Sequence, residues 1–382
     1  MTVASPHLYR RHAPENTDRQ LVERALAQSS APLSKGLPSI LTLRHLGHLT
    51  GADYKYLRSV VQREYDGYRT FSIRKRSGGT RLIASPEPVL GEVQRWIASK
   101  VLNKVSVHKN SFAYKPGSNP KKCASVHLGA SWLIKIDIHD FFESITERRV
   151  YYSFLDCGYQ PLVAFELSRL CTRVFTGKPN VGPQWSTRRR HGSRVYATSE
   201  LGHLPQGAPT SPMLSNMVSF ELDHKLSTLA NDYGFVYTRY SDDLAFSSGE
   251  KFTHKAAGEF VQNIDRILKS FGHVIHQRKT TIAPPGARKV VLGLLVDGSS
   301  PRLSKELRAR VSDHVRGIEK FGLAMHASER HFASIWGMVN HVNGLISHVR
   351  GVDPELGSNL RSRLTTALAI QGWSAETIAG HP

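Results

Sequence analysis

Tyr240-Ser241-Asp242-Asp243-Leu244 lies between two alternating apolar runs, Phe235-Val236-Tyr237-Thr238-Arg239 upstream and Ala245-Phe246 downstream. This pattern predicts a strand, a tight turn and a second strand, with two adjacent carboxylates at the turn. The two acids repel each other unless a cation neutralises them, and a hairpin tip fixes their geometry as a divalent metal site requires. Aspartate is also common in turns for local reasons, so the significance of the pair depends on the rest of the chain.

The composition favours a soluble protein with a polyanionic partner, and 382 residues suffice for two or three subdomains. Lys and Arg total 51 against 31 Asp and Glu, a formal net charge of +20, although a solvated basic surface would also explain this excess. The three cysteines form no paired motif, and we find no signal peptide and no apolar run of membrane-spanning length. We therefore expect a reducing, cytoplasmic location and no membrane association.

Hydrophobic periodicity predicts a mixed α+β chain without internal repeats. The first predicted elements are a short N-terminal helix and linker, a basic hairpin at 70–84, a helix through Leu90 and Ile97, and a strand at 132–138. Helices follow at 150–174, from Ser211, and through Phe260 and Leu268. The last predicted elements are a buried strand at 290–296 and helices from Leu303 onward. The basic, Gly- and Pro-rich stretch 176–203 is expected to be an irregular insertion, either a solvated loop or a nucleic-acid contact.

Asp137, near the end of the predicted strand 132–138, offers a third carboxylate. An acid at a strand end can be only a polar edge. A two-metal phosphoryl-transfer site, however, needs such a third ligand, because two Mg²⁺ ions about 3.5–4 Å apart activate a 3′ hydroxyl and stabilise the leaving pyrophosphate. Magnesium suits a site of few carboxylates that is completed by substrate phosphates and water.

A third motif lies between these acids and runs Leu204-Pro205-Gln206-Gly207-Ala208-Pro209-Thr210-Ser211-Pro212-Met213-Leu214-Ser215-Asn216. Gly207 and the prolines predict a loop that leads into a helix N-terminus, which favours a phosphate or a template backbone. Taken alone, the motif could be an ordinary loop-to-helix junction. Its place between Asp137 and Asp242 disfavours that interpretation.

With these motifs in this order, the chain resembles a prokaryotic reverse transcriptase, and within that group a retron reverse transcriptase. The matching segments are Phe71 to Pro86, Ser111-Phe112-Ala113-Tyr114, Asp137 to Ile145, Leu204 to Asn216, Tyr240 to Asp243, Gln277-Arg278-Lys279-Thr280 and Val291-Leu292-Gly293-Leu294. The resemblance implies a right-hand polymerase fold with fingers, a palm of antiparallel sheet with helices, and a helical thumb. We expect an N-terminal helical segment and linker at 1–45, fingers and palm at 46–298, and an RNA-binding thumb at 299–382.

The resemblance also implies roles for individual residues. Asp137, Asp242 and Asp243 would hold two Mg²⁺ ions, for which Mn²⁺ could substitute, with the Ile138 carbonyl as a further ligand. The other implied roles are an aromatic gate against the ribose 2′ hydroxyl for Phe142, triphosphate contacts for Lys75 and Arg81, a contact near the nucleotide sugar for Gln206, and protonation of pyrophosphate for Lys279. The competing interpretations are core packing for Phe142, surface charge for Lys75 and Arg81, and a helix-end cation for Lys279.

Two segments depart from the retron pattern. Retron enzymes usually carry Asn-Ala-x-x-His between the second and third motifs, whereas this chain reads Cys123-Ala124-Ser125-Val126-His127. They also usually carry Val-Thr-Gly before the thumb, and here the segment is Val291-Leu292-Gly293. These departures leave polymerase activity as the expectation but weaken the assignment to retrons over a sister bacterial lineage.

The resemblance implies an RNA-directed DNA polymerase that copies part of a cognate structured non-coding RNA, using deoxynucleoside triphosphates. Priming from a guanosine 2′ hydroxyl would give RNA-linked single-stranded DNA (msDNA), and a role in antiphage defence with a separate effector protein is expected. The alternatives are another bacterial defence-associated reverse transcriptase or a group II intron-like one; the latter is disfavoured because no maturase-like extension follows the helical tail. A non-catalytic RNA-binding scaffold is disfavoured by the three retained acids.

Overall fold

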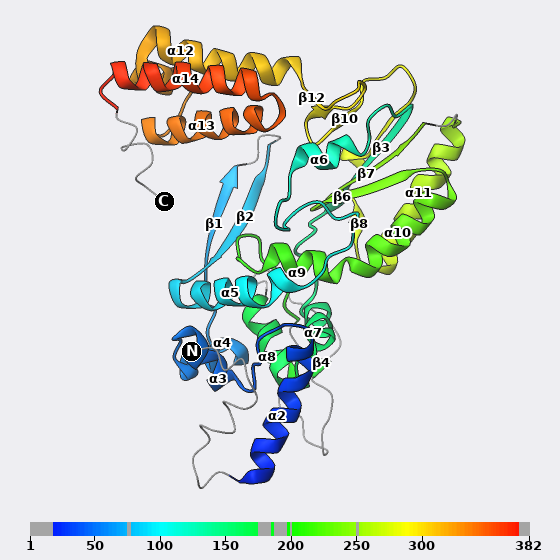
Figure 1. Ribbon diagram of the computed structural model, residues 1–382, viewed down its shortest axis with the longest axis vertical. Helices are drawn as coiled ribbons and strands as arrows, with labels where there is room; N and C mark the ends of the chain where they lie inside the picture. Colours follow the sequence, from blue (N-terminus) through cyan, green and yellow to red (C-terminus); the bar gives the residue numbers. More distant parts are fainter. Residues whose placement is uncertain are drawn as a thin grey trace.

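The computed structural model describes residues 18–74, 78–174, 201–249 and 252–373, together with the backbone of 185–186 and 197–198. Figure 1 shows N-terminal helices at one end of the long axis, a sheet with its helices in the middle, and a helical C-terminal part at the other end. The predicted α+β class is confirmed, with 54% helix and 15% strand.

The N-terminal region is helical, in agreement with the sequence. Its helices are α2 (Arg19–Ser34), α3 (Leu43–Thr50) and α4 (Tyr54–Gln62). Each begins at a side chain that accepts a hydrogen bond from a backbone N–H of the first turn, namely Asp18, Thr42 and Asp53. The part of the predicted N-terminal segment before residue 18 lies outside the described residues.

The predicted basic hairpin consists of β1 (Tyr68–Arg74) and β2 (Thr80–Pro86), which pair antiparallel with Arg74 opposite Thr80. Helix α5 (Pro88–Lys100) and the short η1 (Leu102–Lys104) follow, and the predicted apolar face of α5 is buried at Leu90 and Ile97. The hairpin itself projects from the body of the molecule (Figure 1), and its residues Phe71 and Ile73 are about half exposed.

The central sheet contains β3 (Trp132–His139), β6 (Val236–Tyr240), β7 (Asp243–Ser248), β8 (Val274–Ile275) and β9 (Thr281–Ala283). The strand order is β6-β7-β3-β8, with β9 also paired to β3, and all these pairs are antiparallel. Strand β3 is buried along almost its whole length, which matches its continuous apolar run. The sheet therefore presents the ends of β3 and β7 at one common edge.

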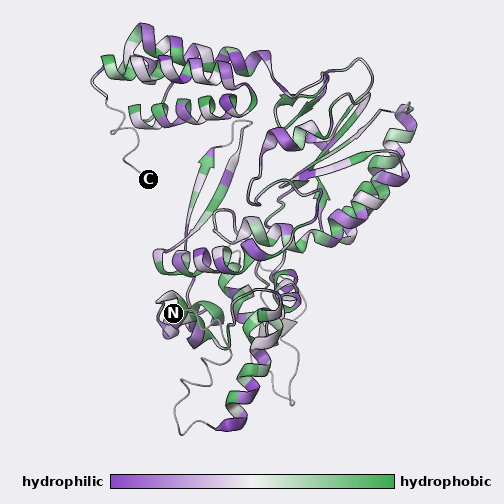
Figure 2. Cartoon of the chain, viewed as in Figure 1, coloured by the Kyte–Doolittle hydropathy of each residue, from purple (hydrophilic) through white to green (hydrophobic). Residues whose placement is uncertain are grey.

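Helices pack on and beside this sheet and form the larger apolar core. They are α7 (Glu147–Asp156), α8 (Pro161–Cys171), α9 (Ser211–Val218), α10 (Phe220–Asp232) and α11 (His254–Ser270). The short α6 (Pro120–Ser125) also contacts the sheet, but its Ala124 belongs to a second apolar cluster. Figure 2 shows hydrophobic and hydrophilic residues alternating around the helices, as amphipathic elements require. The aromatic rings of Phe235 and Phe260 stack at 4.5 Å between sheet and helix α11.

Two predicted helical stretches are interrupted in the structure, and a predicted insertion lies largely outside the described residues. The helix expected at 150–174 is two helices, α7 and α8, with Gly158 at a φ of 93° between them. The helix expected from Ser211 breaks at the buried Ser219 into α9 and α10. Of the expected insertion at 176–203, only the short pair β4 (Trp185–Ser186) and β5 (Ala197–Thr198) and residues 201–203 lie within the described ranges.

The strand expected at 290–296 is also wrong as a single element. It is a tight hairpin of β10 (Val290–Val291) and β11 (Leu294–Leu295), followed by β12 (Arg302–Leu303). Leu292 and Gly293 form its turn with φ values of 51° and 79°. Two consecutive positive φ angles reverse the chain as in a two-residue hairpin.

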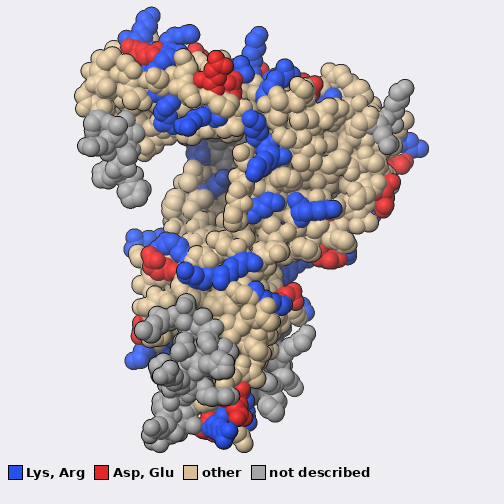
Figure 3. Space-filling model, in the orientation of Figure 1, with Lys and Arg blue, Asp and Glu red and all other residues tan. Residues whose placement is uncertain are grey.

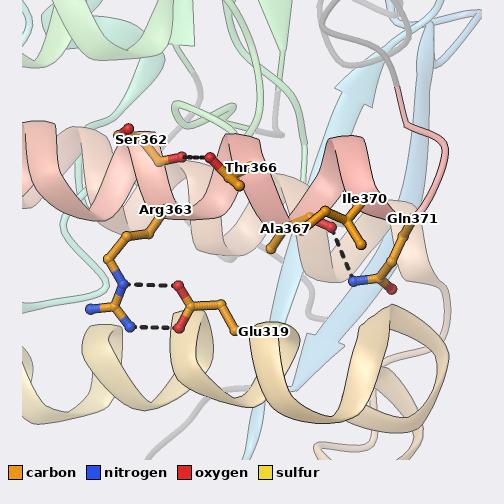
Figure 4. A pocket seen from close by; sticks show the side chains of 7 residues that line it. All are labelled: Glu319, Ser362, Arg363, Thr366, Ala367, Ile370 and Gln371. Carbon is orange, nitrogen blue, oxygen red and sulfur yellow. Dashed lines mark hydrogen bonds and ion pairs between the residues drawn. The ribbon is translucent and has the colours of Figure 1, made fainter.

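The C-terminal part is helical as predicted and consists of α12 (Lys305–Glu329), α13 (Ile335–Val352) and α14 (Pro354–Ile370). It forms a second apolar cluster. Helix α12 kinks at Gly322, which has a φ of 78°. Figure 4 shows Arg363 of α14 bonded to Glu319 of α12 through two hydrogen bonds of 2.9 and 2.6 Å, and Gln371, just after the end of α14, bonded to the Ala367 carbonyl.

Helix α13 exposes glycines at a seven-residue spacing, namely Gly337, Gly344 and Gly351. A Cβ atom at Gly344 or Gly351 would meet nothing within 4 Å, so the protein's own packing does not require glycine there. In Figure 1, α13 is the helix of this part that lies nearest the β1–β2 hairpin. Figure 3 shows a hollow between the hairpin and the C-terminal helices, with Lys and Arg side chains near it.

Candidate active site

The turn between β6 and β7 carries Asp242 and Asp243, as the alternating pattern predicts. Ser241 reverses the chain there with a left-handed φ of 62°. The backbone N–H of Ile138 donates a 3.0 Å hydrogen bond to the Asp242 carbonyl and joins the turn to β3. The register places Asp137 directly opposite Asp243, so their side chains lie on the same face of the sheet. The structure thus brings the three predicted acids to one sheet edge.

The charges at this edge are incompletely neutralised. The pKa of Asp243 is raised to about 6, first because surrounding protein atoms limit its hydration and then because of the Asp242 and Asp137 carboxylates. Its side chain nevertheless retains solvent access. Asp137 is more enclosed, and both its carboxylate oxygens accept hydrogen bonds from Lys279 Nζ, at 3.0 and 2.9 Å. Lys279 is in η2 (Gln277–Lys279), which is tied to β3 by a bond from His276 N–H to the Asp137 carbonyl.

The oxygen donors at this edge are of the kind that Mg²⁺ prefers. Within the ranges that the structure describes, no three His, Cys, Asp or Glu side chains are already arranged as a metal site. The Asp137 carboxylate is bonded to Lys279, and Asp243 carries a raised pKa. A divalent cation would relieve the carboxylate repulsion that, after burial, contributes to this raised pKa, and the donor set would fit such an ion if Lys279 gave up Asp137.

Phe142 is linked to the aspartate turn by the aromatic side chain of Tyr114. It is half-buried, and its ring centroid is 5.7 Å from Phe141 and 6.2 Å from Tyr114. The Tyr114 hydroxyl in turn shares a 2.7 Å hydrogen bond with Ser241 Oγ. Tyr114 therefore contacts both the ring of Phe142 and the turn that holds Asp242. The sequence motif around Tyr114 was recognised, but its contact with Ser241 could not be inferred from spacing.

The loop 204–210 packs against the β1–β2 hairpin. The Gln206 carbonyl accepts a 2.7 Å hydrogen bond from the Ala84 N–H. Gly207 has a φ of 116°, and a Cβ there would lie 2.9 Å from the side chain of Ile83. We expected this helix N-terminus to be open to a phosphate. Thr210 and Ser211 at the start of α9 are buried, however, so the terminus is not open to one. The motif instead sets the position of the hairpin relative to the sheet.

Of the two predicted triphosphate contacts, Arg81 belongs to the hairpin. Arg81 is exposed on β2 opposite Ile73, and within the described residues it has no ion-pair partner. Its guanidinium is accordingly available to a ligand. Lys75 lies outside the described residues.

Cys123 and Leu292, the two departures from the retron pattern, line one cavity of about 280 Å³ together with Asp243 and Lys135. His127 of the same motif is buried, and its ring nitrogens lie 2.7 Å from Ser247 Oγ and 2.7 Å from Thr238 Oγ1. Burial raises the pKa of the Cys123 thiol to about 11, so it is neutral. Cys123 and Leu292, although far apart in the sequence, thus line the same cavity as Asp243, a candidate metal ligand.

The family profile described as "Reverse transcriptase (RNA-dependent DNA polymerase)" matches residues 73–296, more than half of the chain. The chain belongs to the reverse transcriptase family. This reverse transcriptase is an RNA-directed DNA polymerase. Members of the family generally use divalent metals such as Mg²⁺.

Curated relatives of this reverse transcriptase carry retron names. Retron Mx162 reverse transcriptase of Myxococcus xanthus is 29% identical over 352 residues, which cover 87% of this chain and 68% of the relative. Retron Ec86 reverse transcriptase of Escherichia coli is 26% identical over 347 residues, with 87% and 95% covered. Retron Mx65 reverse transcriptase of Myxococcus xanthus is 33% identical over 304 residues, with 78% and 64% covered.

Solved structures similar to this reverse transcriptase include telomerase from Candida albicans with a fragment of telomeric RNA, at 11% identity and a TM-score of 0.41, covering 90% of this chain and 70% of that one. A foamy viral protease-reverse transcriptase with double-stranded DNA matches at 14% identity and a TM-score of 0.40, covering 82% and 42%. Among the helices of the described residues, none is long and apolar enough to cross a membrane.

Proposed function

We propose that this reverse transcriptase copies part of a cognate structured non-coding RNA into RNA-linked single-stranded DNA (msDNA), primed by a guanosine 2′ hydroxyl of that RNA. The observation that supports polymerisation most directly is the placement of Asp137 opposite Asp243 beside the Asp242 turn. The retron names of several relatives support the choice of template, since they match 78–87% of this chain.

We assign the metal ligands to Asp137, Asp242 and Asp243, with the Ile138 carbonyl as a further candidate. Two Mg²⁺ ions bound there, or Mn²⁺ in their place, would supply activation of the attacking hydroxyl and stabilisation of the leaving pyrophosphate. The raised pKa of Asp243 supports this assignment, because burial of the carboxylate raises it most and the neighbouring Asp242 and Asp137 carboxylates raise it further.

Lys279 is assigned two tasks in sequence. Before metal binding it holds the Asp137 carboxylate through two hydrogen bonds and partly compensates its charge. If a metal took over Asp137, the ammonium of Lys279 would be free to donate a proton to the departing pyrophosphate. Its half-exposed side chain supports this change of partner.

The remaining assignments concern the incoming deoxynucleoside triphosphate. Arg81 and Lys75 of the fingers would bind its phosphates. The guanidinium of Arg81 would form two parallel hydrogen bonds, and the ammonium of Lys75 would act as a single positive charge. Gln206 would lie near the sugar, and Phe142 would exclude a ribose 2′ hydroxyl by crowding. The half-buried ring of Phe142 beside Tyr114 supports a wall of fixed position, since two aromatic neighbours restrict its motion.

The domain limits 1–45, 46–298 and 299–382 are likewise proposals. The C-terminal helices contribute most of a second apolar cluster, which supports the last of them, although Val291, Leu294 and Val296 also join that cluster. A role in antiphage defence with a separate effector protein is proposed from the family resemblance. The second candidate is a defence-associated reverse transcriptase of a sister lineage, favoured by the altered cavity at Cys123 and Leu292.

The test is to purify the full chain with its bound nucleic acid and sequence that material, with and without debranching treatment. The expected result is DNA joined to RNA through a 2′–5′ linkage at one guanosine, absent from an Asp242→Asn preparation. Linear DNA with an ordinary 3′–5′ primer junction would favour the sister lineage. RNA without any DNA, from a protein that also extends no supplied primer, would contradict the polymerase assignment itself.

A further inference from the structure

Arg239 on β6 has the largest completely buried side chain among the described residues, and it lies three positions before Asp242. Its Nε and Nη2 donate hydrogen bonds to the two carboxylate oxygens of Asp223, each at 2.7 Å. Asp223 belongs to α10 and is equally buried. The Tyr237 hydroxyl donates a further hydrogen bond to Asp223, at 2.8 Å. A charged pair is thus enclosed directly behind the aspartate turn.

The guanidinium remains charged in this environment. Burial by itself lowers the pKa of Arg239, but the adjacent Asp223 carboxylate raises it more, so the pKa ends above its usual value. A charged donor holds an acceptor more firmly than a neutral one does.

One guanidinium nitrogen contacts the turn itself. Arg239 Nη1 lies 3.2 Å from the carbonyl oxygen of Ser241. That carbonyl belongs to the planar peptide unit that joins Ser241 to Asp242. Its direction therefore sets the plane from which the Asp242 backbone continues. Ser241 occupies a left-handed conformation with a φ of 62°, which a residue with a side chain adopts only when its surroundings impose it.

The other end of the network reaches two further family motifs. Arg239 Nη2 donates to Ser111 Oγ at 3.2 Å, and Ser111 Oγ donates to Asn216 Oδ1 at 2.9 Å. Asn216 Nδ2 donates to the Ala113 carbonyl at 2.8 Å, one residue before Tyr114. The backbone of Arg239 also bonds to Asn110 and Phe112. The guanidinium therefore links helix α9, the segment around Ser111 and the aspartate turn.

Stability alone is a poor reason for such a pair. Well-packed apolar side chains of similar volume usually serve at least as well in a core, because two charges are costly to remove from water. The polar groups of this pair, however, end at the peptide of a strained turn. A fixed peptide orientation is a property that apolar packing would not supply.

We propose that Arg239 is a positioning residue, which holds the Ser241–Asp242 peptide from behind and thereby fixes how Asp242 and Asp243 face the metal ions and the primer terminus. Asp223 orients the guanidinium, and Ser111 connects it to the neighbouring motif. This inference depends on the metal-ligand roles proposed above for the aspartates. Arg239 contacts no substrate.

The main test is the double variant Arg239→Met/Asp223→Leu, which removes both charges and leaves none unpaired. Primer extension on a supplied RNA template with a DNA primer gives kcat, the KM for deoxynucleotide and the half-saturating Mg²⁺ concentration. A displacement of about 1 Å costs on the order of 100-fold in rate, so we expect kcat to fall about 10- to 100-fold. The KM should stay within about threefold while the half-saturating Mg²⁺ concentration rises, because ligand geometry and not substrate affinity is disturbed.

Arg239→Lys is the conservative variant. An ammonium can still pair with Asp223, but it cannot reach Ser241 and Ser111 together, so kcat should be intermediate. Arg169→Met is the matched control, because Arg169 is also a buried arginine in an ion pair, 2.9 Å from Glu147, away from the aspartate turn. It should lower the melting temperature and leave the kcat of the folded enzyme unchanged.

Wild-type kcat and Mg²⁺ dependence in the folded double variant would overturn the proposal, and so would a change confined to KM. If the double variant does not fold, wild-type kinetics of Arg239→Lys would overturn it. Asp242→Asn, assayed in parallel, distinguishes a failure of this proposal from a failure of the metal-ligand assignment on which it rests. If that variant retains activity, the ligand assignment fails; if it is inactive while the double variant is fully active, only the role of Arg239 fails.

Discussion

Replacing Lys279 by Met should weaken the metal-free enzyme and tighten its binding of Mg²⁺. In the structure, Lys279 Nζ bonds both oxygens of Asp137, and the two side chains are 52% and 12% exposed. Because the lysine is half exposed, we take the contribution of the pair to the free energy of unfolding as about 1 kcal/mol. Lys279 also lowers the pKa of Asp243, so its removal increases the repulsion within the cluster.

The contribution of the Lys279–Asp137 pair to the free energy of unfolding would be lost if Asp137 bound a metal instead. Removing the competing ammonium should therefore lower the Mg²⁺ dissociation constant about fivefold, since 1.4 kcal/mol corresponds to tenfold. The assay is thermal unfolding without nucleotides, first in EDTA and then across a Mg²⁺ titration. We expect Lys279→Met to melt below wild type in EDTA, with the difference closing as Mg²⁺ saturates.

Lys269→Met is the matched control, because Lys269 forms a comparable surface pair with Asp265 at 2.6 Å on α11. It should lower stability by a similar or smaller amount at every Mg²⁺ concentration. The reasoning would be refuted if Lys279→Met left the Mg²⁺ midpoint unchanged or moved it to higher concentration.

Three further expectations concern catalysis and RNA binding. Asp242→Asn or Asp243→Asn should reduce primer extension far more than tenfold while the melting temperature and RNA binding persist, and near-normal extension by either would contradict the metal assignment. Phe142→Ala should raise incorporation of ribonucleotides relative to deoxynucleotides, whereas an unchanged ratio would show that the ring only packs. Replacing the exposed cations of α12 by Gln should weaken RNA binding and flatten its salt dependence in gel-shift series; they are Lys305, Arg308, Arg310, Arg316 and Lys320. Of these, Arg308 already pairs with Asp353 at 3.0 Å, so Arg308→Gln alone should have the smaller effect, and an unaltered slope in the multiple variant would shift attention to the stretch 176–203.

The sequence predicts elements well where periodicity is strong and local. The hairpin around Asp242, the buried strand that ends near Asp137 and the amphipathic helices of the C-terminal part all agree with the structure. The breaks at Ser219 and Leu292 do not follow from periodicity, because apolar residues continue through both positions. They depend on packing that only the folded chain supplies, such as the enclosure of Ser219.

The candidate site divides in the same way. The three aspartates were predictable from motif order, whereas the bonds of Lys279 to Asp137 and of Tyr114 to Ser241 join residues more than a hundred positions apart. The Arg239 network was missed for a similar reason. Its one signal in the sequence is an arginine within a strand whose other alternate positions are apolar. Such a residue cannot be buried without a partner, and the partner Asp223 lies on a separate helix.

The exposed glycines of α13 bear on how firmly this helix is ordered. Glycine costs about 1 kcal/mol relative to alanine in a helix interior, so Gly344, midway along α13, removes about 1 kcal/mol of intrinsic helix preference, whereas Gly337 and Gly351 lie in its first and last turns. Helix α13 must therefore draw its order from the apolar side chains that it buries against α12 and α14. Its amide protons should exchange with solvent sooner than those of α14, through local opening and not through unfolding of the whole molecule. The helix of the C-terminal part that lies nearest the β1–β2 hairpin is accordingly expected to open locally more readily than α14.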